Sequence, residues 1–240
     1  MTEIVGHRGA RGEVPENTLA SFQHAQQLGI RQVELDLHLS ADGQLIVIHD
    51  PDLRRTTGQH GRVDRWHSTD LVQLDASHCG PTHPSPCPIP TLQHLLQACE
   101  FEHWQWEVKS ASRRRARRLV EEIQRLHQQY QLTGKVAITS SSRTVLRAAQ
   151  QLAPEIPRGF VAERAWLNPV KVAKRYDCEL LVLNWKLCTP ARLRQAHAAG
   201  MQVSTWTVNQ AHDMRHLADM GVDSLITDFP GLAIATLHAR

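Results

Sequence analysis

The chain has 240 residues, of which 41% are hydrophobic and 21% charged, and a formal net charge of +3. This length buries one sizeable core, and so small a net charge does not predict a nucleic-acid-binding protein. The sequence shows no secretory signal and no apolar run that could cross a membrane, and its five cysteines form no Cys-x-x-Cys pair, so we expect a cytoplasmic protein with reduced thiols and no stable membrane association.

Short β-like runs alternate with helical runs from the start of the chain. The first strand is expected at residues 3–7, and a helix follows over residues 17–28. Residues 33–39 alternate strictly between apolar and polar side chains, which predicts a strand. A second extended run follows a turn and covers residues 45–49.

The same alternation continues to the end of the chain. Further strands are predicted at residues 102–108, 136–139, 156–161, 179–183, 202–208 and 224–227. Helices are predicted between them at residues 91–100, 113–130, 142–152, 168–175, 190–199, 210–220 and 230–239. About eight such units predict a (β/α)8 TIM barrel, with residues 1–240 as a single domain. A doubly wound α/β sheet is the alternative, because the same alternation serves both folds.

Residues 51–90 interrupt this rhythm, because they are rich in Pro, Gly, His and Ser. We interpret them as an insertion after the second strand, folded over the mouth of the barrel. Cys79 and Cys87 lie there near two histidines and raise the question of zinc. Their spacing matches no common zinc site, so plain loop thiols are the expectation.

Two acidic residues, Glu34 and Asp36, alternate with the apolar residues of the strand predicted at 33–39. Residues two apart in a strand point to the same face, so these carboxylates lie about 7 Å apart on one side. In a barrel the outer face packs on helices and the inner face lines the active site, which places the carboxylates inside. The alternative is an amphipathic edge strand with solvated acids.

A third carboxylate comes from the next predicted barrel strand, where Glu107 and Lys109 share a face at the strand's end. Three carboxylates from neighbouring strands repel one another unless a cation compensates their charge. Carboxylate oxygens suit a hard divalent cation, Mg²⁺ or Ca²⁺, which also binds water and phosphate oxygens. The alternative for Glu107 and Lys109 is a plain ion pair.

Two histidines end predicted strands at the same rim. Arg8 follows His7, and Asp50 follows His49. Histidine titrates near neutrality, so the two can divide the work of acid and base around a phosphate, which Arg8 can hold through two parallel hydrogen bonds. Because the chain has fifteen histidines, structural roles for these two are the alternative.

Several short motifs follow one another along nearly the whole chain. They are Gly6-His7-Arg8-Gly9, Pro15-Glu16-Asn17-Thr18, Glu34-Leu35-Asp36, His49-Asp50-Pro51 with Leu53, Arg55-Thr56-Thr57-Gly58, Ile89-Pro90-Thr91-Leu92, Glu107-Val108-Lys109, Trp206-Thr207-Val208-Asn209 and Ile226-Thr227-Asp228. In this order the sequence resembles the glycerophosphodiester phosphodiesterase family, in particular its small bacterial cytosolic members.

The resemblance implies a barrel with a small insertion after the second strand, a divalent cation, and cleavage of glycerophosphodiesters to glycerol 3-phosphate and an alcohol. It also implies roles for seven residues: His7 and His49 as general acid and base, Glu34, Asp36 and Glu107 as metal ligands, and Arg8 and Lys109 as phosphate contacts.

Three further residues near strand ends have local explanations beside functional ones. Trp206 either walls the substrate pocket against the glycerol carbons or belongs to the core. Asn17 is interpreted as the cap of the first helix, although it also lies near the site in sequence. Asp228 is interpreted as the cap of the last helix.

Five arginines between residues 113 and 118 open a predicted helix and are followed by Glu121 and Glu122. The spacing predicts the pairs Arg117–Glu121 and Arg118–Glu122. We therefore expect a solvated helix face here and no nucleic-acid partner.

Two other functions share these features. A lysophospholipase D-type phosphodiesterase on the same barrel would need an apolar, membrane-facing loop, and residues 51–90 are too polar to supply one. A non-catalytic phosphate-binding protein would not need two titrating histidines. The expected ligand is therefore a small-molecule glycerophosphodiester, and the sequence does not predict an oligomeric state.

Overall fold

A computed structural model describes residues 2–109, 112–164 and 167–238. Eight parallel strands form a ring, in which β1 pairs with both β2 and β9. The strands are β1 (Glu3–His7), β2 (Gln32–Leu39), β4 (His103–Val108), β5 (Val136–Ser140), β6 (Arg158–Ala162), β7 (Leu180–Asn184), β8 (Gln202–Trp206) and β9 (Ser224–Thr227). The closed ring confirms the predicted (β/α)8 barrel, because a doubly wound sheet would leave two strand edges unpaired.

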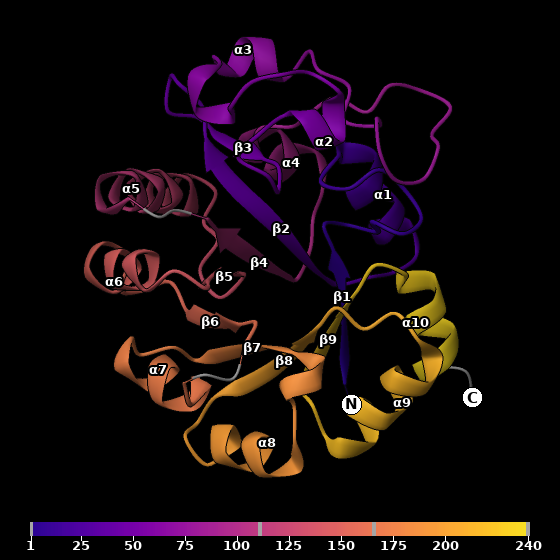
Figure 1. Cartoon of the computed structure of the whole chain (residues 1–240), viewed down its shortest axis with the longest axis vertical. Coiled ribbons are helices and arrows are strands. Elements are labelled where there is room, and N and C mark those ends of the chain that lie inside the picture. Colours follow the sequence, from indigo (N-terminus) through magenta and orange to yellow (C-terminus); the bar gives the residue numbers. More distant parts are fainter. Residues whose placement is uncertain (1, 110–111, 165–166, 239–240) are drawn as a thin grey trace.

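Helices surround this ring, as Figure 1 shows. They are α1 (Leu19–Gln27), α4 (Leu92–Ala98), α5 (Arg113–Gln129), α6 (Arg143–Leu152), α7 (Pro169–Arg175), α8 (Pro190–His197), α9 (Ala211–Met220) and α10 (Pro230–Leu237). Thr91 and Thr189 begin two of them by accepting a hydrogen bond from the first turn. The helix predicted at residues 230–239 is α10, and residue 239 lies outside the described residues.

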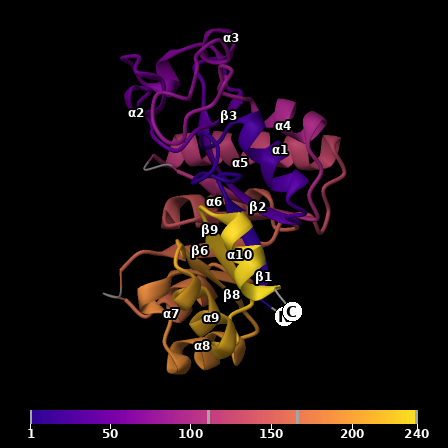
Figure 2. The same ribbon diagram turned by 90° about the vertical axis from the view of Figure 1, so that its right-hand side faces the viewer.

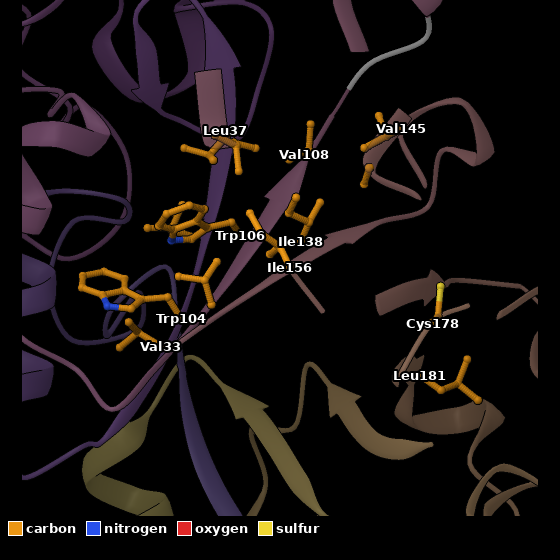
Figure 3. Packing of buried hydrophobic residues seen from close by; sticks show 14 of the residues in the cluster. Val33, Leu37, Trp104, Trp106, Val108, Ile138, Val145, Ile156, Cys178 and Leu181 are labelled. Carbon is orange, nitrogen blue, oxygen red and sulfur yellow. The ribbon is translucent and has the colours of Figure 1, made fainter. Parts of the chain in front are cut away.

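The largest core lies between the barrel wall and the helices. Val33, Leu35 and Leu37 of β2 point into it together with the two fully or nearly buried tryptophans of β4, Trp104 and Trp106. Figure 3 shows several of these side chains gathered on the outer side of the strands. Burying one such side chain contributes about 1.5–3 kcal/mol. Because the apolar residues of β2 face outward, the alternating carboxylates must face inward.

Residues 45–90 form a smaller unit at one end of the molecule, beside β2 and outside the ring, as both Figures 1 and 2 show. It contains β3 (Leu45–Val47), which is antiparallel to β2, and the short helices α2 (Arg54–Thr57), η1 (Val63–Arg65) and α3 (Ser68–Leu71). A separate apolar cluster holds it together, built from Ile46, Ile48, Leu53, Val63, Leu71, Ala76 and Ile89. Residue Arg55 of α2 reaches from this unit to the barrel rim.

All five cysteines are free thiols. Cys79 and Cys87 belong to no group of potential metal ligands within the described part of the chain. No helix in that part is long and apolar enough to span a membrane.

Candidate active site

The residues predicted for the site converge at the carboxyl-terminal rim of the barrel. Seven of them line a cavity of about 100 Å³: His7, Arg8, Glu34, His49, Glu107, Lys109 and Trp206. The rest of its lining is Gln105, Thr139, Val161, Glu163, Val182 and Ile226. Asp36, the eighth predicted residue, is fully buried and contacts Arg8 and Lys109. The parallel register explains this convergence, because β1 pairs His7 with Glu34 and β4 pairs Glu107 with Asp36.

Glu34, Asp36 and Glu107 each offer one carboxylate oxygen within 4.8 Å of the others. Burial, reinforced by the negative charges of Asp36 and Glu107, raises the pKa of Glu34 well above its usual value. Burial also raises the pKa of Glu107 to about 7, against the opposing charge of Lys109. Burial works in the same direction on Asp36, but Lys109 and Arg8 outweigh it and lower the pKa of that carboxyl. When all three are ionised, the carboxylates carry one more negative charge than Arg8 and Lys109 balance, and burial makes that charge costly.

A divalent cation fits this cluster. The Oε1 atom of Glu34 is buried and has no hydrogen-bond partner among the described residues. A buried carboxylate oxygen without a partner is costly, and a bound cation would supply the missing contact. The donors are all carboxylate oxygens, as Mg²⁺ and Ca²⁺ prefer. Within residues 2–109, 112–164 and 167–238, this is the one such group of potential ligands.

Each candidate acid–base histidine is oriented by an aspartate. Nδ1 of His7 lies 2.5 Å from Oδ1 of Asp228, and Nδ1 of His49 lies 2.6 Å from Oδ1 of Asp50. Burial lowers the pKa of both histidines, although the neighbouring carboxylates partly oppose it. Engagement of Nδ1 leaves Nε2 of each ring as the atom available to a substrate. The interpretation of Asp228 as the cap of the last helix was wrong, because Phe229 occupies the N-cap position of α10 and Asp228 contacts His7.

The two cations of the site neutralise Asp36. Nε of Arg8 lies 3.0 Å from Oδ2 of Asp36, and Nζ of Lys109 lies 2.9 Å from Oδ1. Lys109 is farther from Glu107, at 3.6 Å, so the simple strand-end pair considered from the sequence is the weaker of its two contacts. Asn17 donates a hydrogen bond to the same carboxylate at 2.9 Å. Its interpretation as a helix cap was wrong, because Thr18 caps α1.

Glu16 lies at the centre of an arginine cluster that sequence reasoning did not single out. Its carboxylate contacts Arg8 and Arg55 at 2.7 Å and Arg11 at 3.1 Å. Burial opposes ionisation, but the hydrogen bond from Arg55 and the charge of Arg8 prevail and lower the pKa of Glu16 to about 2. Arg55 also donates to Asp50, the partner of His49, at 2.5 Å. Through Arg55, the insertion therefore contacts both Asp50, the partner of His49, and Glu16, the partner of Arg8.

The sequence matches the family described as the glycerophosphoryl diester phosphodiesterase family over residues 7–232. The chain belongs to this family. A glycerophosphodiester phosphodiesterase of Bacillus altitudinis is 30% identical and covers 98% of this chain and 97% of its own length. A second, from Caldanaerobacter subterraneus subsp. tengcongensis, is 29% identical over 95% of both chains. Family membership makes the protein a phosphoric diester hydrolase.

A solved structure shares the fold. The phosphodiesterase of Oleispira antarctica, in complex with the product sn-glycerol-3-phosphate, superposes with a TM-score of 0.87 at 26% identity and covers 99% of this chain and 97% of its own. Because the superposition covers nearly the whole of both chains, the two proteins share the barrel that carries the rim residues described above.

Proposed function

We propose that the protein hydrolyses glycerophosphodiesters such as glycerophosphocholine or glycerophosphoethanolamine to glycerol 3-phosphate and the free alcohol, with a divalent cation. The observation that carries the proposal is the pairing of two aspartate-oriented histidines, His7 and His49, around one cavity that also contains Glu34 and Glu107. Two separate proton-transfer groups suit a reaction in which one oxygen must lose a proton and another must gain one. The product bound by the Oleispira antarctica relative supports the same substrate class.

Positive charge at the rim, from the divalent cation, Arg8 and Lys109, would bind the phosphate. Glu34, Asp36 and Glu107 would hold Mg²⁺ or Ca²⁺, which when bound neutralises phosphoryl charge and makes an attacking oxygen more acidic. Arg8 and Lys109 line the same cavity and would contact the remaining phosphate oxygens, so that their charge stabilises the pentavalent transition state. Their existing contacts with Asp36 fix both side chains before substrate arrives.

Proton transfer falls to the two histidines. One imidazole takes the proton of the attacking hydroxyl or water, and the other gives a proton to the leaving alcohol. Asp228 and Asp50 hold the rings so that Nε2 of each is free for that transfer. Burial keeps the pKa values of both histidines low, so the ring that acts as base is ready in its neutral form at neutral pH.

The walls of the cavity fit the two arms of such a diester. Trp206, half-buried, offers an apolar surface for glycerol carbons. Glu163 is exposed and lines the same cavity, where its negative charge would attract a cationic head group. This arrangement favours choline or ethanolamine as the alcohol. Within the described residues the cavity measures about 100 Å³, and charged side chains form much of its lining, so a lysophospholipid with its long acyl chain is the less suited substrate.

The test is release of glycerol 3-phosphate from glycerophosphocholine by the purified protein, before and after chelation and after return of Mg²⁺ or Ca²⁺. We expect activity that chelation abolishes and either cation restores. Lysophosphatidylcholine serves as the parallel substrate for a lysophospholipase D and should turn over more slowly. Activity that survives exhaustive chelation would remove the cation from the proposal, and binding of glycerophosphocholine without turnover would favour the non-catalytic alternative.

A further inference from the structure

A set of six exposed cations lies on helices α5, α6 and α7, which cover one flank of the barrel (Figure 1). We call this set the cationic face: Arg113, Arg117, Arg143, Arg147, Lys171 and Arg175. Two hollows run through it. One, of about 500 Å³, is lined by the four arginines of α5 and α6, and the other, of about 250 Å³, is lined by Arg143 with the two cations of α7.

The cations of this face are scarcely neutralised. Among the residues that the structure describes, the six make one ion pair, Arg117 with Glu121 at 3.9 Å. The pair expected between Arg118 and Glu122 does not form. Glu122 instead contacts Arg125, on its other side along the helix, at 2.6 Å. The helix face is exposed, as expected, and the predicted pair Arg117–Glu121 forms, but Arg113 has no ion pair among the described residues.

The shape of the face suits an extended anionic surface. Arg113 and Arg117 are one helical turn apart, or about 6 Å, and packed helices lie about 8–10 Å from one another. Three helices thus spread six charges over roughly 20 Å, and all six are exposed. A single small anion would be held by converging, buried donors, which this face lacks.

An exposed apolar residue accompanies the charges. Leu167 is 53% exposed and lines the smaller hollow beside Arg143 and Lys171. Basic residues around a protruding aliphatic side chain are the features by which peripheral proteins bind anionic bilayers. A single-stranded nucleic acid would instead stack on exposed aromatic rings, and the tyrosine of this face, Tyr176, is buried beneath Arg147.

The face adjoins the candidate active site. Arg113 and Arg143 begin helices that follow β4 and β5, and Leu167 lies in the connection after β6, so all three stand at the rim that carries the site. Lys109, in the site, is four positions before Arg113 in the sequence. A surface bound to this face would consequently lie next to the mouth of the cavity.

We infer that the cationic face, with Leu167, binds the protein reversibly to anionic lipid bilayers, with the cavity mouth close to the lipid surface. Binding is electrostatic and weakens as salt screens the charges. A basic residue near an anionic membrane is worth about fivefold in affinity, so removal of two should weaken binding roughly 30-fold. The inference does not depend on the reaction proposed above, because vesicle binding requires no turnover.

The experiment is sedimentation of the full chain with vesicles of phosphatidylcholine, with and without phosphatidylserine, at low and high salt. The wild type should bind the vesicles that contain phosphatidylserine at low salt and release them at high salt. The double variant Arg143→Gln, Arg147→Gln should bind about 30-fold more weakly, and Leu167→Ser should weaken binding less. A matched control, Arg194→Gln with Arg215→Gln, removes the same charge from exposed positions on α8 and α9.

Equal loss of binding in both double variants would overturn the inference, because it would make net charge the cause. Failure of the wild type to bind phosphatidylserine vesicles would overturn it directly, as would binding of a single-stranded oligonucleotide in place of vesicles. The variants at Arg143 and Arg147 should retain the melting temperature and the activity on soluble glycerophosphocholine. Retention of both shows that a loss of vesicle binding does not come from misfolding.

Discussion

The carboxylate of Asp228 lies 2.5 Å from Nδ1 of His7, although the two residues are 221 positions apart in the chain. Asn209 donates a second hydrogen bond to Asp228 at 2.8 Å, so the aspartate is itself held in place. The pair fixes the plane of the imidazole and directs Nε2 into the cavity. This contact gives the first of the predictions that follow.

Asp228→Ala should lower kcat by about 10²-fold or more, because His7 loses the partner that fixes its orientation and tautomer. The pKa of His7 should fall further, since burial already lowers it and Asp228 opposes that shift. The limb of the pH profile of kcat that His7 controls, acid if His7 is the base and alkaline if it is the acid, should therefore move to lower pH. Asp223→Ala is the matched control, because it removes the carboxylate 2.8 Å from His197, away from the site. Normal turnover by Asp228→Ala would make the contact structural only.

His7→Ala and His49→Ala should each lose about 10²–10⁴-fold in activity on glycerophosphocholine, because each removes a proton-transfer group. With a p-nitrophenyl ester the leaving group needs no proton, so one variant should recover part of its activity. That variant identifies the general acid. Equal losses on both substrates would contradict the division of labour between the two histidines. Free phosphate should not accumulate from either substrate.

Mg²⁺ or Ca²⁺ should raise the melting temperature of the wild type by about 5–10 °C at a hundredfold excess over Kd, because only the folded state presents the carboxylate cluster. Zn²⁺ should be a poor substitute for such an all-oxygen site. Glu34→Gln and Asp36→Asn should reduce the shift, and Glu102→Gln, an exposed acid outside the site, should leave it intact. A shift equal in all four proteins would place the cation elsewhere.

The arginine cluster around Glu16 should make stability depend on pH. The pKa of Glu16 is lowered to about 2 in the folded protein, from an ordinary 4.5. The unfolded chain therefore takes up the proton first, and stabilisation that is fully present above pH 4.5 is lost as the pH falls towards 2. The contribution is about 3 kcal/mol.

Glu16→Gln should remove that part of the pH dependence and lower stability at neutral pH, because Arg8 and Arg55 lose their shared counter-charge. Urea unfolding of both proteins at a series of pH values measures the difference. Parallel stability curves for wild type and variant between pH 4.5 and 2 would show that the pKa of Glu16 is not depressed.

Glu163→Gln should lower kcat/KM for glycerophosphocholine relative to glycerophosphoglycerol by about fivefold, the worth of one exposed ion pair. The ratio of the two kcat/KM values is the quantity to compare, because effects common to both substrates cancel in it. One such effect is a change in the pKa of Glu107, which the charge of Glu163 helps to raise. An unchanged ratio would mean that the head group does not approach Glu163.

The alternation of Glu34 and Asp36 with leucines was sufficient to predict the inner face of β2, because burial of one strand face is a local property of the sequence. Boundaries were less predictable. The fifth barrel strand was expected from Ile156, but β6 begins at Arg158, since Pro157 has no N–H to donate to the sheet.

The second layer of the site was not predictable. Glu16, Arg55 and Glu163 lie on loops or a short helix, where no periodicity marks a side chain as facing the site. Asp228 and Asn17 were interpreted as caps because each precedes a helix. Their hydrogen-bond partners, His7 and Asp36, come from other strands, so the neighbouring sequence does not indicate them. Asp228 approaches His7 only when β1 pairs with β9, and Asn17 approaches Asp36 when β1 pairs with β2.

Closure of the barrel between β1 and β9 has a consequence for biogenesis. A nascent chain that lacks its last strand already contains every proposed metal ligand, yet its His7 has no aspartate, so it is catalytically incomplete until almost all of it has been made. During refolding, pairing of the first and last strands is the contact of longest loop, and long loops form slowly. Recovery of activity should therefore come later than recovery of the helical circular dichroism signal, and it measures the pairing of β1 with β9 that closes the barrel.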